Sequence, residues 1–213
     1  MTLTSKKEGV VQKEHIDKAI SYGDFKQIVK DNYDKGEPTS VIADKDMLLD
    51  FTKLNIKRMD RLDDQVELNP ELMKELDQLS ENWYWLVLAE GWCGDVAQNL
   101  PIIHKIADNC DKVDLKVLFR DQNTEVIDNY LTNGGRSIPK LIVLRSDNLE
   151  DWGPRPEPIQ EMVMEVKKLK EGDTPKKELI DEYHKKMHKW YAKDKGQTIQ
   201  KELLELVREW KNV

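Results

Sequence analysis

Residues 83–95 read WYWLVLAEGWCGD, and they decide the fold class of this chain. The first seven, Trp83–Ala89, are apolar and rich in aromatics, and the run is too short for a typical helix. Such a run suits a strand that is covered on both faces. Cys93 follows where this strand ends, and a helix-compatible stretch begins at about Asp95. The stretch therefore predicts a central strand that delivers a cysteine to the start of a helix.

The residues that follow predict the rest of a sheet. The predicted elements are a helix over 95–109 and strands over 113–119, 138–144 and 149–152. The segment 113–119 reads VDLKVLF, whose alternation and β-branched residues are typical of a strand. Because a strand, a helix and a second strand follow one another, we expect a right-handed crossover and two parallel strands.

Helical periodicity flanks this sheet on both sides. On the N-terminal side, one stripe of an amphipathic helix is formed by Met47, Leu48, Phe51 and Leu54. On the C-terminal side, apolar residues at helical spacing predict further helices, and we expect about 40 C-terminal residues to form a helical hairpin. We expect an N-terminal helical extension packed on the core over 1–80, a core domain over 81–158 and C-terminal helices over 159–213.

Composition and charge exclude several classes of protein. The 34 Lys and Arg residues against 41 Asp and Glu residues give a net charge of −7, which argues against a nucleic-acid binder. No stretch approaches the roughly 20 apolar residues that span a bilayer, and the charged N-terminus lacks an apolar signal core. We therefore expect a cytoplasmic protein with no membrane partner. With two cysteines, Cys93 and Cys110, the chain has neither a disulfide framework nor a cysteine zinc site.

Cys93 is the candidate nucleophile on physical grounds. The free amides at the start of a helix favour an anion, and they can lower a thiol pKa from about 8.5 into roughly the 3.5–7.5 range. Asp95 has two opposing effects, because its carboxylate suits the helix dipole but disfavours a neighbouring thiolate. Arg136 and Lys140 would offset this repulsion if they pointed inward. The alternative for Cys93 is a small, buried packing residue.

The motifs around Cys93 resemble those of the thioredoxin family. The resemblance rests on Trp92-Cys93-Gly94, on Pro101, on Ser137-Ile138-Pro139-Lys140-Leu141 and on Trp152-Gly153, and it covers Trp83 to Pro158. It implies an α/β thioredoxin fold, a mixed four-stranded core sheet flanked by helices, here with extra N- and C-terminal helices. It also implies a cis Ile138–Pro139 bond beside Cys93. The implied substrate-binding residues are Trp92, Gly94, Ile138 and Pro139, with Trp92 and Ile138 flanking a shallow apolar groove.

The chain departs from the thioredoxin pattern at the second cysteine. Val96 stands in that position, and Asp95 replaces the intervening proline. Cys110 lies 17 residues beyond Cys93, about 25 Å along a helix, which exceeds the Cα separation of about 4.4–6.8 Å that a disulfide requires. The strand before the motif also lacks the buried acid of dithiol thioredoxins. These departures exclude a fast intramolecular disulfide switch.

Two functions fit this pattern. The first is thiol-disulfide exchange by a single active cysteine, with Cys93 and Asp95 as catalytic residues and a protein or low-molecular-weight disulfide as partner, as in single-cysteine glutaredoxins. The second is a redox-inactive protein-binding module, which keeps the peptide groove of the fold and uses the terminal helices as its partner surface. An iron–sulfur carrier is a third possibility with a poor motif match. We expect no cofactor and no metal site, since His184 and His188 lack a third ligand nearby. The oligomeric state is left open.

Overall fold

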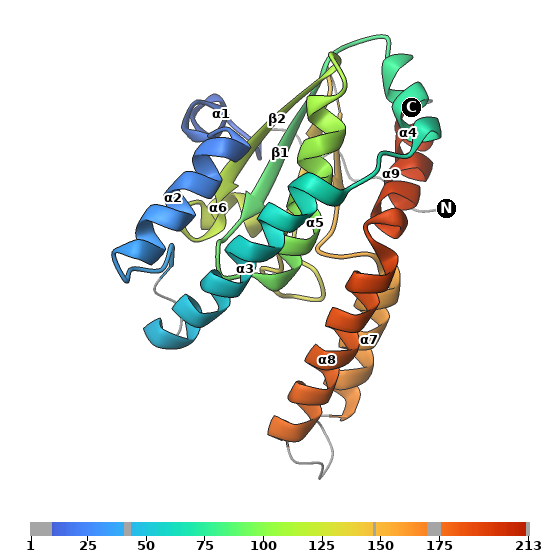
Figure 1. The fold of residues 1–213 in the computed structure, drawn as a ribbon. Coiled ribbons are helices and arrows are strands. Elements are labelled where there is room, and N and C mark those ends of the chain that lie inside the picture. Colours follow the sequence, from blue (N-terminus) through green and yellow to red (C-terminus); the bar gives the residue numbers. More distant parts are fainter. Residues whose placement is uncertain (1–9, 41–43, 147, 170–175, 212–213) are drawn as a thin grey trace.

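The computed structural model describes residues 10–40, 44–146, 148–169 and 176–211, and a four-stranded mixed sheet lies at its centre (Figure 1). The strands are β1 (Trp83–Ala89), β2 (Val113–Phe119), β3 (Lys140–Leu144) and β4 (Leu149–Trp152). Their order is β2-β1-β3-β4, with β1 parallel to β2 and antiparallel to β3, and β3 antiparallel to β4. The predicted mixed four-stranded sheet is confirmed. The third strand begins at Lys140 because Ile138 and Pro139 form the turn before it.

β1 is central because its sequence suits a strand that is buried on both faces. It pairs with β2 from Trp83 opposite Val113 to Ala89 opposite Phe119, and with β3 on its other side. Six of its seven side chains are buried, and Tyr84 is the half-buried exception. Because β1 pairs with a strand on each side, its buried backbone N–H and C=O groups have hydrogen-bond partners.

Helices pack around the sheet. α5 (Gly94–Asp108) makes the crossover from β1 to β2, and α3 (Lys45–Gln65) packs against it (Figure 1). The remaining helices before the C-terminal part are α1 (Lys13–Lys18), α2 (Tyr22–Asp34), α4 (Pro70–Asp77), the 3-10 turn η1 (Arg120–Gln122) and α6 (Thr124–Ile127). α1 and α2 lie along β2, where a backbone bridge joins Ile20 to Val117.

The C-terminal helices are α7 (Glu157–Leu169), α8 (Lys176–Asp194) and α9 (Gln197–Trp210). α7 packs against α8, whereas α9 continues from α8 and packs against α4 (Figure 1). The expected hairpin within the last 40 residues is therefore wrong, since the hairpin consists of α7 and α8. The chain bends between α8 and α9 at Lys195 and Gly196, whose φ angles are 54° and 78°. This bend lets the apolar face of α9 join the core instead of folding back on α8.

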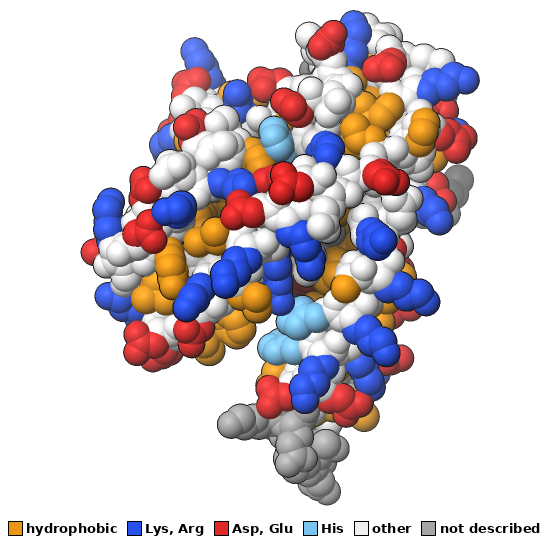
Figure 2. Space-filling model, viewed as in Figure 1, with side chains coloured by type: hydrophobic (Ala, Val, Ile, Leu, Met, Phe, Trp, Pro, Cys, Tyr) orange, Lys and Arg blue, Asp and Glu red, His pale blue; other side chains and the backbone are white. Residues whose placement is uncertain are grey.

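The apolar stripe predicted for α3 is only partly buried. Leu48 is 2 % exposed, but Met47, Phe51 and Leu54 are 44 %, 40 % and 45 % exposed. The buried face is polar in places, and its members are Leu48, Thr52, Asn55, Met59 and Leu62. The Asn55 side chain donates to the Gly91 carbonyl at 3.0 Å and so fixes the rotation of α3 over the turn after β1. Figure 2 shows hydrophobic side chains exposed among basic ones over the N-terminal half of α3.

One large hydrophobic core joins the N-terminal helices, the sheet and α9. It joins apolar residues of α2, α3 and α4 to both faces of the sheet and to α9, where Ile199, Leu203 and Val207 are fully buried. A small second cluster of Ile159, Met187 and Tyr191 holds α7 to α8. Among the described helices, none has the length and apolar character that crossing a bilayer requires.

We predict that α9 contributes directly to the stability of the sheet. Leu203→Ala removes a side chain with 0 % exposure and should lower the free energy of unfolding by about 2–5 kcal/mol. Leu169→Ala is the matched control, because Leu169 is 52 % exposed at the end of α7 and its truncation should change that free energy by less than about 0.5 kcal/mol. Urea denaturation measures both. Equal effects of the two substitutions would contradict this packing.

Candidate functional site

Cys93 lies where the end of β1, the start of α5 and the turn before β3 meet. It is the N-cap residue of α5, and its backbone N–H donates to the Glu90 carbonyl at 3.2 Å. Its half-buried thiol donates to the Ile138 carbonyl oxygen, with 3.4 Å between Sγ and oxygen. The Ile138–Pro139 peptide bond is cis. The sequence motifs that surround Cys93 are thus brought together in space.

The protonated thiol is the favoured form of Cys93. Burial, followed by the neighbouring Asp95 carboxylate, raises the pKa of the Cys93 thiol to about 12. The backbone amides of Val96 and Asp95, together with Arg155, act in the opposite direction. The helix start therefore does stabilise negative charge, but burial and the carboxylate outweigh it.

Asp95 makes most of its contacts with the C-terminal part of the chain. Its side chain is buried, and Arg155 donates to Oδ2 through Nε and Nη2, each at 2.8 Å. The Tyr191 hydroxyl donates to Oδ1 at 2.9 Å, and Asn99 donates to the same hydroxyl at 3.2 Å. Asp95 thus joins the first turn of α5 to the segment before α7 and to α8.

A cavity of about 630 Å³ opens beside Cys93. It is lined by Trp92, Cys93, Arg120, Asp121, Gly134, Arg136, Ser137, Ile138 and Arg155. The expected groove beside Trp92 and Ile138 is present as a cavity whose lining combines apolar residues with three arginines and one aspartate. The Ile138 side chain is 3 % exposed and belongs to the core. Gly94 and Pro139 are outside this lining.

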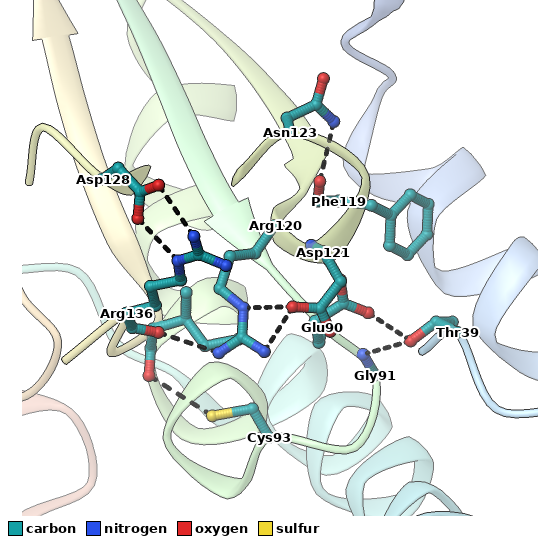
Figure 3. A network of polar contacts seen from close by, with 11 residues as sticks. Thr39, Glu90, Gly91, Cys93, Phe119, Arg120, Asp121, Asn123, Asp128 and Arg136 are labelled. Atoms are coloured by element: carbon teal, nitrogen blue, oxygen red, sulfur yellow. Dashed lines mark hydrogen bonds and ion pairs between the residues drawn. The ribbon is translucent and has the colours of Figure 1, made fainter. Parts of the chain in front are cut away.

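Two arginines of the cavity lining, Arg120 and Arg136, belong to the polar network in Figure 3. The Arg120 guanidinium lies 5.1 Å from the Trp92 ring centroid, donates to Asp121 Oδ1 at 2.7 Å and donates to the Arg136 carbonyl at 2.8 Å. Arg136 forms a two-pronged pair with Asp128, with N–O distances of 2.6 and 2.8 Å. Arg120 therefore stacks on the tryptophan beside the cysteine, and Arg136 stands at the rim.

In the described part of the chain, Arg136 and Lys140 pair with Asp128 and Asp151 rather than with the thiol that they were expected to influence. Lys140 is buried and donates to Asp151 at 3.0 Å and to the Gly153 carbonyl at 3.2 Å. Arg155, which follows β4, is the cation that lowers the pKa of Cys93. The positive charge beside Cys93 thus comes from a residue outside the motif.

Glu90 is a buried acid directly behind the site. It is 0 % exposed, and its carboxylate accepts hydrogen bonds from the Thr39 hydroxyl at 2.5 Å and from the Asp121 backbone N–H at 2.9 Å. Burial raises the pKa of Glu90 to about 7. Glu90 links the segment before α3, the end of β1 and η1 (Figure 3).

The structure keeps the two cysteines apart. Cys110 is 5 % exposed beyond the C-terminal end of α5, while Cys93 caps its N-terminal end. Val96, in the position of a second motif cysteine, is 1 % exposed and packs in the core. An internal disulfide with Cys93 is therefore out of reach in this fold.

The paired histidines of α8 face a cation. Arg58 donates through Nη2 to the His188 ring at 3.1 Å. Burial and Arg58 lower the pKa of His188 to about 4. Within the described part of the chain, no three His, Cys, Asp or Glu side chains are grouped so as to hold a metal ion. His188 is best described as a packing partner of Arg58.

The family model described as Thioredoxin matches residues 42–170. The chain belongs to the thioredoxin family. A solved structure of a protein of unknown function from Pseudomonas aeruginosa is similar, with 16 % sequence identity, a TM-score of 0.54 and coverage of 92 % of this chain and 96 % of that one. An HIV epitope scaffold has 17 % identity, a TM-score of 0.49 and coverage of 70 % and 79 %. No curated protein matches.

Four residues of this thioredoxin-family site are missing from the sequence prediction: Glu90, Arg120, Arg155 and Tyr191. The positions of Glu90 and Arg120 could have been predicted, because Glu90 directly follows β1 and Arg120 directly follows β2. The carboxyl ends of parallel strands meet at one edge of the sheet, where ligands bind in open α/β folds. Arg155 and Tyr191 could not have been predicted in this way, since only the tertiary fold brings them to Asp95.

We predict that Asp95 stabilises the fold and keeps the thiol protonated. Asp95→Asn leaves Arg155 buried without its carboxylate and should lower the free energy of unfolding by about 3–5 kcal/mol. It should also move the pH profile of Cys93 alkylation to lower pH. Asp128→Asn is the control, because it breaks an exposed arginine pair and should cost about 1 kcal/mol or less. An Asp95→Asn protein as stable as the Asp128→Asn protein would contradict the anchoring role.

Glu90 gives a second, pH-dependent prediction. The folded pKa of about 7 exceeds the ordinary value of 4.5, so the folded state binds the proton more tightly than the unfolded chain. The free energy of unfolding should therefore fall by about 3 kcal/mol as pH rises through this interval. Glu90→Gln should remove that decrease. Urea denaturation of the unchanged protein and of Glu90→Gln, from about pH 4.5 to 8, measures this decrease. If the free energy of unfolding changes with pH in the same way in both proteins, Glu90 is not the group responsible.

Proposed function

We propose that this thioredoxin-family protein acts by binding a ligand in the Cys93 cavity, without rapid thiol turnover. The observation that carries this proposal is that the Cys93 thiol donates a hydrogen bond to the Ile138 carbonyl oxygen, with 3.4 Å between Sγ and oxygen. The thiolate is the nucleophile in disulfide exchange, and burial together with Asp95 raises the pKa of the Cys93 thiol, which disfavours that form. A site in this state offers a shaped, charged cavity and a weak nucleophile.

Two further features support binding over turnover. Val96 fills the place of a resolving cysteine, so a mixed disulfide on Cys93 has no internal thiol to release it. Asp95, the carboxylate closest to Cys93 in sequence, is occupied by Arg155 and the Tyr191 hydroxyl. Its effect on the thiol is to disfavour ionisation, which is the opposite of activation.

Single-cysteine thiol-disulfide exchange is the second candidate, and the place of Cys93 in the cavity lining favours it. In that reaction the Cys93 thiolate attacks one sulfur of a disulfide R–S–S–R′. A Cys93–S–S–R bond forms and R′–S⁻ leaves. An external thiolate then attacks the mixed disulfide and returns Cys93 to the thiolate, with a disulfide of R and the external thiol as product. Trp92 and the Ile138 carbonyl would flank the attacked sulfur.

The pH dependence of alkylation separates the two functions. In a Cys110→Ser protein, iodoacetamide labelling followed by intact mass reports Cys93 alone, and the Cys93→Ser/Cys110→Ser protein is the blank. Binding without turnover predicts slow labelling at neutral pH. The rate should rise about tenfold per pH unit without a plateau below about pH 10.

A plateau with an apparent pKa below about 8 would overturn the binding proposal and establish thiol exchange as the function. Incubation of the same protein with 2-hydroxyethyl disulfide gives a second readout. Formation of a mixed disulfide on Cys93 within minutes at neutral pH would also overturn the binding proposal and support thiol exchange.

A further inference from the structure

The walls of the Cys93 cavity carry an excess of guanidinium groups. Three of the lining residues are arginines and one is a carboxylate, Asp121. The other two carboxylates that pair with these arginines, Asp95 and Asp128, are outside the lining. The cations therefore reach the cavity while two of their three counter-ions lie away from it.

The arginines keep hydrogen-bond donors for a ligand. A guanidinium has five N–H groups, and Arg136 uses Nε and Nη2 on Asp128, so its Nη1 donates to no residue in the described part of the chain. The indole N–H of Trp92 is buried and likewise lacks a protein acceptor among the described residues. Arg136 thus presents a guanidinium N–H group without a protein acceptor, and the Trp92 indole N–H lies buried behind the lining.

The donors are held in place before any ligand arrives. Arg120 is 7 % exposed, stacks on Trp92 and is tied to Asp121 and to the Arg136 carbonyl. Asp121 is itself held through its backbone N–H by the buried Glu90 carboxylate. Arg155 is fixed by Asp95 and by Gln160, to which Nη1 donates at 3.2 Å. Ordered side chains lose little conformational entropy on binding, which favours affinity.

We infer that the cavity binds a small organic anion, with a carboxylate of the ligand held by Arg136 together with Arg120 and Arg155. This inference rests on the proposed function and names the ligand class of the same site. A planar guanidinium matches a carboxylate in two-pronged geometry, and such charge-assisted hydrogen bonds are the strong ones. The cavity volume of about 630 Å³ suits a small molecule, since ligand sites commonly span about 300–1,000 Å³.

Citrate is the probe, and the Trp92 indole N–H is the reporter. The full chain, labelled with ¹⁵N, is titrated with citrate at constant ionic strength, and Trp92→Phe assigns the indole resonance. Triethyl citrate, the neutral ester of the same skeleton, and inorganic phosphate are titrated in parallel. We expect a saturable shift with citrate, no shift with the ester and a weaker response to phosphate.

Arg136→Gln is the deciding variant, because this exposed arginine can be replaced without leaving a buried charge. It should weaken citrate binding about tenfold or more, which corresponds to about 1.4 kcal/mol. Arg208→Gln is the matched control, since Arg208 is a similarly exposed arginine that pairs with Glu71 and Glu75 at α4, and it should change affinity less than about twofold. Equal citrate affinity in both variants overturns the inference. Equal binding of the ester, or tighter binding of phosphate, does so as well.

The outcomes separate this inference from the proposed function. If citrate fails to bind while Cys93 resists alkylation, the binding function stands and the anion assignment falls. If Cys93 is alkylated rapidly at neutral pH and citrate still binds through Arg136, the protein is a thiol-exchange enzyme. The anion site then recognises a carboxylate of its substrate. Cys93→Ser should keep citrate affinity, because the anion contacts arginines rather than sulfur.

Discussion

A carboxylate buried in the first turn of a helix needs partners, and Asp95 finds them in two parts of the chain that lie far away in sequence. Arg155 provides a two-pronged ion pair and Tyr191 provides a hydroxyl. These contacts attach the segment before α7 and the helix α8 to the same turn of α5 that carries Cys93. The C-terminal helices are therefore part of the site's construction, and the position of Arg155 in the cavity wall depends on them.

The same carboxylate adds to the effect of burial on the cysteine. At the start of a helix a thiol would ordinarily gain thiolate character from the free amides. Here burial and the negative charge of Asp95 outweigh those amides and the nearby Arg155. A proline in place of Asp95 would remove this charge but would also remove the partner of Arg155. The same carboxylate thus disfavours the Cys93 thiolate and attaches the C-terminal helices.

The sheet was predictable from the sequence, because the apolar run Trp83–Ala89 and the alternating, β-branched stretch 113–119 both favour strands. The buried face of α3 was not, since Met47, Phe51 and Leu54 are exposed, while the polar Asn55 is buried and donates to the Gly91 carbonyl. The sequence predicted Trp92, Cys93 and Ile138 as site residues, and all three line the cavity. The Ile138 side chain also belongs to the hydrophobic core. The charge of the cavity was missed, because Arg155 reaches it only through tertiary contacts.

The most direct test is an NMR titration of the Cys93 thiol itself. The ¹³Cβ shift of cysteine reports ionisation, so a Cys110→Ser chain labelled with ¹³C at cysteine Cβ gives a single resonance to follow with pH. The account predicts no ionisation step below about pH 10, because burial and Asp95 hold the proton. A midpoint below about pH 8 would contradict it, since Cys93 would then be an ionised nucleophile under ordinary conditions.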